Sequence, residues 1–281
     1  MDTDEEKAGV FRDFFSSVHK VDSGLKISLA TAHHDVEIPR MQITPETVFL
    51  VLRGLKRNKS PGPDSIHAEI ICPIAEYICH PVSELFNQSL AEGVIPADWK
   101  EAAVIPIFKG GQRNVVCNYR PVSLTCILCK VMENIIRSHT CEYLTLNKLI
   151  APTQHGFTKG KSCLTNLLSF LDEVTMRLDE GKVVEVCYLD FSKAFDSVNH
   201  RLLLHKLSFL GIKGEILSWI EGFLKDRTFK VQVGSATSNE ASAFSGVPQG
   251  SILGPLLFLI YIDDLSGALN VLLSLSPMTL R

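Results

Sequence analysis

The spacing of hydrophobic positions predicts a series of helices from Thr44 onward. Between Val48 and Leu55, apolar side chains recur three and four residues apart after a Thr-Pro-Glu start, which is typical of a helix with one buried face. The turn-forming sequence 58–64, Asn-Lys-Ser-Pro-Gly-Pro-Asp, ends this helix. Similar patterns predict further helices at about 66–78, 81–91, 128–147, 163–180, 199–210 and 213–224.

Between these helices, shorter segments have the composition of strands. The β-branched run 102–108 and the extended stretch 118–126 flank a Lys-Gly-Gly turn and favour a hairpin. Residues 183–189 predict a buried strand, and alternation over 229–233 predicts another. The apolar stretch 251–262 is expected to form one helix. Because strands and helices lack a regular βαβ alternation, we predict a mixed α+β fold.

The first part of the chain shows little regular patterning. Only Phe11, Phe14, Phe15 and Val18 have helix-like spacing. We therefore expect residues 1–43 to be a loosely ordered leader or the remnant of a linker.

Composition narrows the class of protein. The chain has 281 residues, of which 46% are hydrophobic and 21% charged, enough for a substantial core. The longest apolar run, 256–262, is far shorter than the ~20 residues that a bilayer requires, so no membrane partner is expected. The acidic start lacks a signal sequence, and the eight cysteines have no disulfide-framework spacing. We expect a monomeric intracellular protein, of the nucleus or the cytoplasm.

The charge balance gives no direct support for a nucleic-acid partner. The formal net charge is −3, and the first 50 residues hold nine acidic and five basic side chains. The remainder is nearly balanced, which leaves room only for a local basic groove.

Asp190 is the first candidate for chemistry because it follows a predicted buried strand. Carboxylates at strand ends commonly hold metal ions, and nucleotidyl transfer uses two Mg²⁺ ions held by carboxylates. A strand-end aspartate can also simply cap a turn or a helix.

Five ordered motifs resemble the reverse transcriptases of non-LTR retrotransposons. The two most specific are Tyr188-Leu-Asp-Phe-Ser-Lys-Ala-Phe-Asp-Ser-Val198 and Gly246-Val-Pro-Gln-Gly-Ser-Ile-Leu-Gly-Pro255. The others are residues 58–64, the segment from Trp99 to Lys109 with Asn118-Tyr-Arg-Pro-Val-Ser-Leu124, and Gln154-His-Gly-Phe-Thr-Lys-Gly-Lys-Ser162. A group II intron maturase is a lesser alternative.

The resemblance implies a right-hand polymerase with small antiparallel sheets. Residues 44–182 would be fingers with template-facing helices at their start, and residues 183–265 part of the palm. Residues 266–281 would be a divergent tail, with the thumb absent. The family's reaction is RNA-templated DNA synthesis from deoxynucleoside triphosphates on a DNA primer.

Residue roles follow from the same resemblance. Asp190 matches the first metal-binding aspartate, and the carbonyl of Phe191 would add a ligand to the same Mg²⁺ ion. Phe195 matches the aromatic residue against the nucleotide sugar, although core packing would also explain it. Gln249 resembles the glutamine of the nucleotide pocket, in a loop whose geometry also suits a helix start.

Basic residues are implied to bind phosphates. Arg120 and Lys109 match two residues that contact the incoming triphosphate, and a hairpin would carry both. The positions implied to lie near nucleic acid are Arg53, Lys56, Arg57, Lys59, Lys159 and Lys161. Exposed, solvated side chains are the alternative for Lys109 and for each of these six.

Cys126 and Cys129, with His139 and Cys141, suggest a zinc site at first sight. Only one Cys-x-x-Cys pair is present, and its neighbours form an apolar helix face. We therefore expect buried thiols and no zinc.

The sequence departs from the family at its second metal-binding motif. Tyr261-Ile-Asp-Asp264 is an Asp pair, but it directly continues the predicted helix 251–262, whereas the family places its motif on a later β-hairpin. Residues 266–281 contain no acidic side chain. We expect fingers with an incomplete palm that binds Mg²⁺ weakly, as a single ion, and catalyses little. The alternatives are a non-catalytic nucleic-acid-binding remnant and an unfolded pseudogene product.

Overall fold

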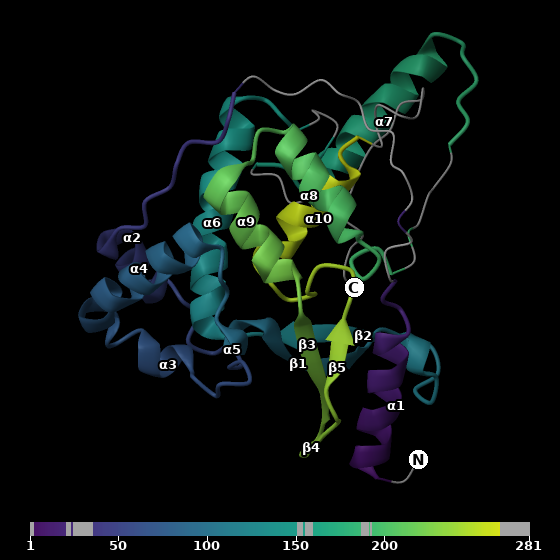
Figure 1. Ribbon diagram of the computed structural model, residues 1–281. Helices are drawn as coiled ribbons and strands as arrows, with labels where there is room; N and C mark the ends of the chain where they lie inside the picture. The colour runs from purple at the N-terminus through teal and green to yellow at the C-terminus, as the bar shows by residue number, and fades with distance from the viewer. Residues whose placement is uncertain are drawn as a thin grey trace.

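The computed structural model describes residues 3–20, 24, 36–150, 154, 160–186, 191 and 193–264 (Figure 1). The helices are α1 (Asp4–Ser16), α2 (Pro45–Arg53), α3 (Ala68–Ile71), α4 (Ala75–Glu92), α5 (Ala97–Lys100), the 3₁₀ turn η1 (Val116–Asn118), α6 (Ile127–Leu146), α7 (Cys163–Asp179), α8 (His200–Phe209), α9 (Gly214–Leu224) and α10 (Gly254–Ile262). The strands are β1 (Glu101–Phe108), β2 (Tyr119–Leu124), β3 (Arg227–Val233), β4 (Ala236–Thr237) and β5 (Ala241–Ala243). The fold is a mixture of helix and sheet, as predicted.

The strands form one mixed sheet in the order β2-β1-β3-β4, with β5 also paired to β3. β1 and β2 are an antiparallel hairpin in which Phe108 lies opposite Tyr119, so the predicted hairpin is confirmed. β3 runs parallel to β1, with Phe229 opposite Ala102. The sheet therefore joins two distant parts of the chain. β1 and β2 end by Leu124, and β3, β4 and β5 begin more than 100 residues later, at Arg227.

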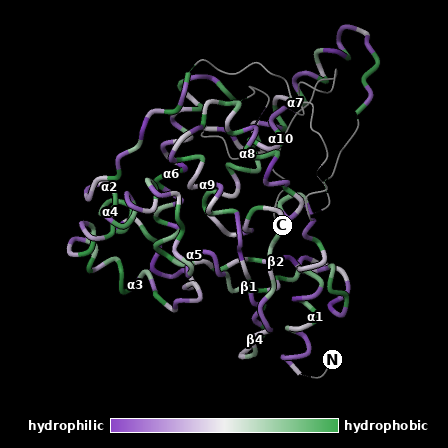
Figure 2. The backbone as a smooth tube through the Cα atoms, viewed as in Figure 1, coloured by the Kyte–Doolittle hydropathy of each residue, from purple (hydrophilic) through white to green (hydrophobic). Residues whose placement is uncertain are grey.

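Two hydrophobic cores hold the elements together. The larger lies among α2, α4, α6, α8, α9 and α10 and contains Phe86, Trp219 and Phe223 with essentially no exposed surface. The smaller lies between α1 and the sheet, at the lower right of Figure 1. Hydrophobic and hydrophilic residues alternate along the helices in Figure 2, as expected when each buries one face.

The leader expected over residues 1–43 contains an ordered helix. Helix α1 begins after Thr3, whose hydroxyl accepts a hydrogen bond from the Glu6 N–H. Phe15 of this helix packs with Val104 and Phe229 of the sheet and is only 3% exposed. The expectation of a loose leader is therefore wrong over Asp4–Ser16, because the helix-like phenylalanine spacing supplies a face that the sheet buries.

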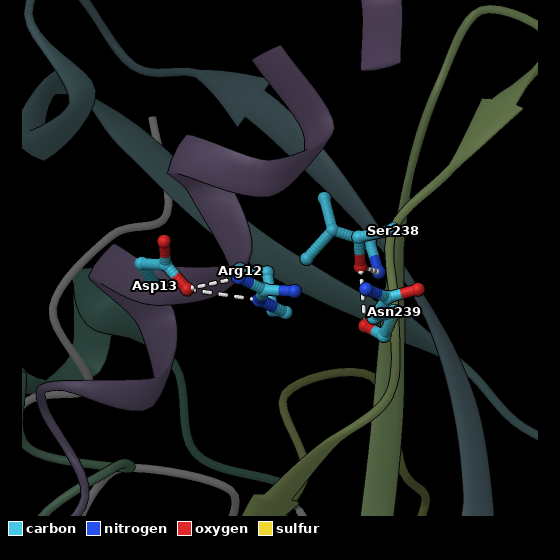
Figure 3. Close-up of polar contacts among 5 residues, drawn as sticks. Arg12, Asp13, Ser238 and Asn239 are labelled. Atoms are coloured by element: carbon cyan, nitrogen blue, oxygen red, sulfur yellow. Dashed lines mark hydrogen bonds and ion pairs between the residues drawn. The ribbon is translucent and has the colours of Figure 1, made fainter. Parts of the chain in front are cut away.

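Two sets of local polar contacts lie in α1 and beyond the β3–β4 hairpin (Figure 3). Within α1, Arg12 pairs with Asp13 at 2.6 Å. Beyond β4, the Ser238 hydroxyl accepts from the Val231 N–H and donates to the Asn239 carbonyl. The Ser238 contacts therefore hold the chain that leaves β4 against β3.

Most helix boundaries agree with the predictions. Thr44 caps α2 by accepting from the Thr47 N–H, and Asn199 caps α8 by accepting from the Leu202 N–H. The turn 58–64 separates α2 from α3, as expected. No helix in the described part of the chain is both long enough and apolar enough to cross a membrane.

The two helices predicted at 66–78 and 81–91 are divided differently. The structure has a single-turn helix, α3, followed by α4, which passes through Pro81 without ending. The break lies at Pro73 instead. The residues of α4 that face the core recur three and four positions apart on both sides of the proline: Ala75, Cys79, Val82, Phe86 and Leu90. Burial of this continuous face outweighs the one hydrogen bond that Pro81 cannot donate.

The strand predicted at 183–189 is not formed over its described residues. Residues 183–186 have no regular structure, and Val183 is 91% exposed. Residues 187–190 lie outside the described part of the chain. The physical reason is a missing partner, since none of the described strands pairs with 183–186 and an isolated β-rich segment gains nothing from its propensity.

Helix α10 is joined to α6 by one buried carboxylate. Glu133 has no exposed surface, and its Oε2 accepts from the backbone N–H groups of Ile252 and Leu253 at 2.7 and 2.9 Å. Burial raises the pKa of the Glu133 carboxyl, while these hydrogen bonds and nearby Arg227 oppose the rise. The expected helix at 251–262 is confirmed with a start at Gly254, because residues 251–253 form the capped turn before it.

Glu133→Ala is therefore expected to destabilise the fold by about 2–4 kcal/mol, because the backbone amides of Ile252 and Leu253, one partly and one fully buried, lose their acceptor. Urea unfolding followed by the fluorescence of Trp99 and Trp219 measures this change. The control is Glu142→Ala, at an exposed position of the same helix, which should change stability by less than about 0.5 kcal/mol. Equal effects of the two substitutions would contradict the capping role of Glu133.

Candidate functional site

The loop 245–250 and the turn 193–198 pack against each other. The Gly246 N–H donates to the Val198 carbonyl at 2.8 Å. Gly246 has φ +84°, and a Cβ there would lie 2.7 Å from the Cα of Asp196. Only glycine allows this approach. The described part of the motif 188–198 therefore lies beside the motif 246–255 in the structure.

Gln249 connects this loop to two other elements. Its Nε2 lies 2.9 and 3.1 Å from the two carboxylate oxygens of Asp196. Its backbone carbonyl accepts from the Ser123 N–H of β2 at 2.6 Å. The next residue, Gly250, has φ +116°, and a Cβ there would lie 2.5 Å from the Ser123 carbonyl oxygen. Gln249 is thus held between the turn 193–198 and the outer edge of β2.

The Asp196 side chain is partly buried. Burial raises its pKa, and the hydrogen bond from Gln249 and the charges of His19 and Lys193 act in the opposite direction. The ammonium group of Lys193 lies 4.4 Å from the centre of the Phe14 ring in α1. The turn that carries Asp196 is therefore also in contact with the N-terminal helix.

The segment after α1 fastens the loop from the other side. The His19 Nδ1 lies 2.9 Å from the Ser245 carbonyl oxygen, and the Lys20 N–H donates to the Ser245 hydroxyl. That hydroxyl in turn donates to the Asp196 carbonyl at 2.7 Å. Burial lowers the pKa of His19, which favours a neutral ring. We assign the ring proton to Nδ1 because a carbonyl oxygen can only accept.

A small cleft lies between α1, the sheet and the loop. Among the residues that line it are Phe15, Val104, Asp196, His200, Arg227 and Gln249. The His200 Nε2 lies 2.7 Å from the Gly246 carbonyl oxygen, and burial lowers the pKa of this histidine. Arg227 donates through Nη1 to the Phe223 carbonyl, whereas its buried Nη2 has no hydrogen-bond partner among the described residues. The cleft thus combines apolar walls with several fixed polar groups.

Lys109 and Arg120 both belong to the β1–β2 hairpin. Arg120 lies opposite Ile107, and Lys109 follows β1 with its N–H bonded to the Asn118 carbonyl. Strand alternation places both side chains on the face that carries Ile107. Ser123 and Pro121 lie on the other face and line the cleft. The structure therefore brings Lys109 and Arg120 together on one hairpin but places their face opposite to the cleft that contains Gln249.

The aromatic candidates lie in different surroundings. Phe195 stacks on Phe258 of α10 with ring centres 4.5 Å apart, so it is part of the packing around α10. Phe191 is 49% exposed. Asp190, the central candidate for metal binding, lies outside the described residues.

The basic candidates near the start of the chain are all exposed. Arg53 ends α2 and lies over the Phe49 ring, and Lys56, Arg57 and Lys59 follow it. The turn after them is anchored, because a Cβ on Gly62 would lie 2.5 Å from the Thr125 carbonyl carbon. The arrangement presents a group of cationic side chains from a fixed turn.

The basic loop 154–161 is only partly described. The Lys161 ammonium donates to the Gln154 carbonyl at 3.0 Å, and Gln154 is 2% exposed. Lys159 lies outside the described residues.

The residues that the structure describes do not assemble a metal site. No three His, Cys, Asp or Glu side chains come together in a metal-binding group within the described ranges. Asp264 lies two residues after the end of α10 and pairs with Lys206 at 2.6 Å. Tyr261-Ile-Asp-Asp264 therefore lies at the end of a helix, as predicted from the sequence, and not on a β-hairpin.

The cysteines Cys126 and Cys129 are buried free thiols at the start of α6. Burial raises the pKa of Cys126 to about 12. Cys129 has no exposed surface, burial raises its pKa well above the usual value, and its thiol lies 3.6 Å from a carboxylate oxygen of Glu133. Zinc binding requires thiolates, which this environment disfavours.

Several residues of the site escaped sequence reasoning. Asp196 belongs to the motif 188–198, directly after the candidate Phe195, and this position could have identified it as a site residue. His19 and Glu133 gave no signal, because their partners lie 226 and about 120 residues away. Such contacts become visible only once the chain is folded.

Comparison with known proteins adds a family match. Residues 108–274, more than half of the chain, match the family model described as reverse transcriptase (RNA-dependent DNA polymerase). The chain is 31% identical over 233 residues to the RNA-directed DNA polymerase from mobile element jockey of Drosophila melanogaster. The aligned region covers 82% of this chain and 25% of that protein.

Two further relatives match over similar lengths. The chain is 28% identical over 231 residues to the probable RNA-directed DNA polymerase from transposon BS of Drosophila melanogaster, covering 82% of this chain and 25% of the relative. It is 29% identical over 225 residues to the Pol polyprotein from type-1 retrotransposable element R2 of Popillia japonica, covering 79% and 30%. The chain thus spans about a quarter of the length of the curated relatives it matches. It belongs to the reverse transcriptase family and is a reverse transcriptase domain of the non-LTR retrotransposon type.

Proposed function

We propose that this chain supplies the fingers and the nucleotide-side part of the palm for RNA-templated DNA synthesis. In that reaction a primer 3′-hydroxyl attacks a deoxynucleoside triphosphate and pyrophosphate leaves. Residues 44–182 would form the fingers and residues 183–265 this part of the palm. The family membership supports the reaction class, and the names of the relatives from jockey and transposon BS describe RNA-directed DNA polymerases.

The observation that carries the proposal is the position of Gln249. Its backbone is bonded to Ser123 of β2, and its side chain is bonded to Asp196, five residues beyond Phe191. Arg120 lies three residues from Ser123 on the same strand, about 10 Å away along an extended chain. Arg120 and Gln249 lie on opposite faces of the hairpin, but β2 is an edge strand of the sheet, so a nucleotide lying across this edge would contact the loop on one face and Arg120 on the other.

Each candidate takes the role that the family resemblance implies. Arg120 and Lys109 would bind the triphosphate, Gln249 and Phe195 the nucleoside. Asp190, with the Phe191 carbonyl, would hold a Mg²⁺ ion. These two residues would supply a single carboxylate, whereas two-ion chemistry needs carboxylates that hold both ions.

Template and primer would bind through the basic residues. Arg53, Lys56, Arg57 and Lys59 are exposed around the end of α2 and the turn that follows it. Lys159 and Lys161 would contact the backbone of the template or the primer from the loop 154–161. Lysine and arginine side chains attract phosphates and release counterions, so this binding should depend on salt.

The 281-residue polypeptide by itself is expected to show no primer extension with Mg²⁺ or Mn²⁺. Charge stabilisation by two ions accounts for most of this kind of catalysis, and Asp263 and Asp264 lie at a helix end where Asp264 pairs with Lys206. An assay with an RNA template, a DNA primer and all four deoxynucleotides tests this. Robust extension that Asp190→Ala abolishes would overturn the expectation.

Binding of single-stranded RNA provides a test that does not need catalysis. Replacing Lys56, Arg57 and Lys59 together with Ala should weaken binding and reduce the slope of log affinity against log salt by about 2, at roughly 0.7 per phosphate contact. A fluorescence anisotropy titration at several salt concentrations measures both effects.

The matched control replaces three other cationic residues with Ala: Lys7, Lys182 and Lys225. Each belongs to an exposed ion pair, and the change in net charge is the same. An equal loss of slope in both triple variants would show that only total charge matters, and would remove the assignment of template binding to the turn after α2.

A further inference from the structure

Asp196 is bound to Gln249 in a way that fixes the orientation of the carboxamide. The Gln249 Nε2 is within hydrogen-bond distance of both carboxylate oxygens, at 2.9 and 3.1 Å. A carboxyl group can donate from at most one of its oxygens, so the group that is hydrogen-bonded to both oxygens must be the NH₂ group and not the carbonyl oxygen. The Oε1 atom of Gln249 is therefore the end of the carboxamide that is turned away from Asp196.

The carboxylate that imposes this orientation is itself held in place. The Asp196 backbone carbonyl accepts from the Ser245 hydroxyl, and Ser245 is bonded to His19 and Lys20 of the segment after α1. On the other side of the turn, Gly246 allows the loop to approach the Asp196 backbone. Asp196 cannot move without disturbing contacts to both neighbouring segments.

We propose that Asp196 is a positioning residue: it orients the Gln249 carboxamide so that Oε1 accepts a hydrogen bond from a donor group of the incoming deoxynucleotide. The inference rests on the proposed function, because it assumes that Gln249 contacts the nucleotide. Asp196 acts only through Gln249. A side chain that is already held in its binding orientation binds a ligand more tightly, because it loses less conformational freedom on binding.

Asp196→Asn is the most informative substitution. It keeps the size of the side chain but adds an NH₂ donor, which can bond to the Gln249 Oε1 and reverse the carboxamide. The nucleotide would then meet an NH₂ group in place of an acceptor. Loss of one hydrogen bond to a polar ligand group corresponds to a roughly tenfold change in dissociation constant.

The experiment is a double-mutant cycle on the 281-residue chain, with the dissociation constant of dTTP in Mg²⁺ measured by isothermal titration calorimetry. Asp196→Asn and Gln249→Ala should each weaken dTTP binding about tenfold, and the double variant should be no weaker than Gln249→Ala alone. A role of Asp196 in general stability would instead add to the effect of Gln249→Ala.

The outcomes separate the two proposals. If Gln249→Ala weakens dTTP binding and Asp196→Asn does not, or if the two effects add, the positioning role is overturned and the nucleotide site stands. If Gln249→Ala has no effect, or dTTP does not bind to the unaltered chain, the proposed nucleotide site fails and the positioning role fails with it.

A measurement on the unaltered chain covers the case in which Asp196→Asn does not fold. In ¹⁵N NMR spectra, the side-chain NH₂ group of Gln249 should exchange with solvent at least about tenfold more slowly than that of Gln112, which is in an exposed turn. Equal exchange rates would mean that Asp196 does not hold the carboxamide, which would overturn the proposal.

Discussion

The carboxylate of Glu133 connects two parts of this fold that lie about 120 residues apart in the sequence. It is completely buried, and it accepts the N–H groups of Ile252 and Leu253 just before α10 begins. A negative charge is favourable at a helix N-terminus, where backbone N–H groups have no partner within the helix. The C-terminal end of the loop 245–250 is thereby held close to α6.

The loop is fixed at its near end by contacts of a different kind. Ser245 is held by the segment after α1, and Gly246 is packed on the turn 193–198. Gln249 is bonded to β2 midway between these two anchors. A loop tied at three places loses little conformational entropy when a ligand binds, which is a useful property for a nucleotide pocket.

Local patterns in the sequence predicted the elements but not the contacts that organise the site. The β1–β2 hairpin, the α8 cap at Asn199 and the helical setting of Tyr261 to Asp264 all followed from spacing and turn chemistry. The predicted helix break near Pro81 was wrong because a continuous buried face holds α4 together. The predicted strand that begins at Val183 was wrong over its described residues because a strand needs a neighbouring strand. The contacts of His19 and Glu133 span more than 100 residues, so no local pattern could reveal them. The roles of Asp190, Phe191 and Lys159 still rest on the family resemblance.

The central claim is that a nucleotide binds where the loop 245–250 meets the β1–β2 hairpin. Photo-crosslinking with 4-thio-dTTP tests it most directly, since irradiation attaches the nucleotide to the residues beside it and mass spectrometry of the peptides then identifies them. The claim predicts adducts on peptides that contain Gln249 or the hairpin segment 109–120, and their loss when excess dTTP is added. Adducts confined to other segments, or unaffected by dTTP, would contradict it.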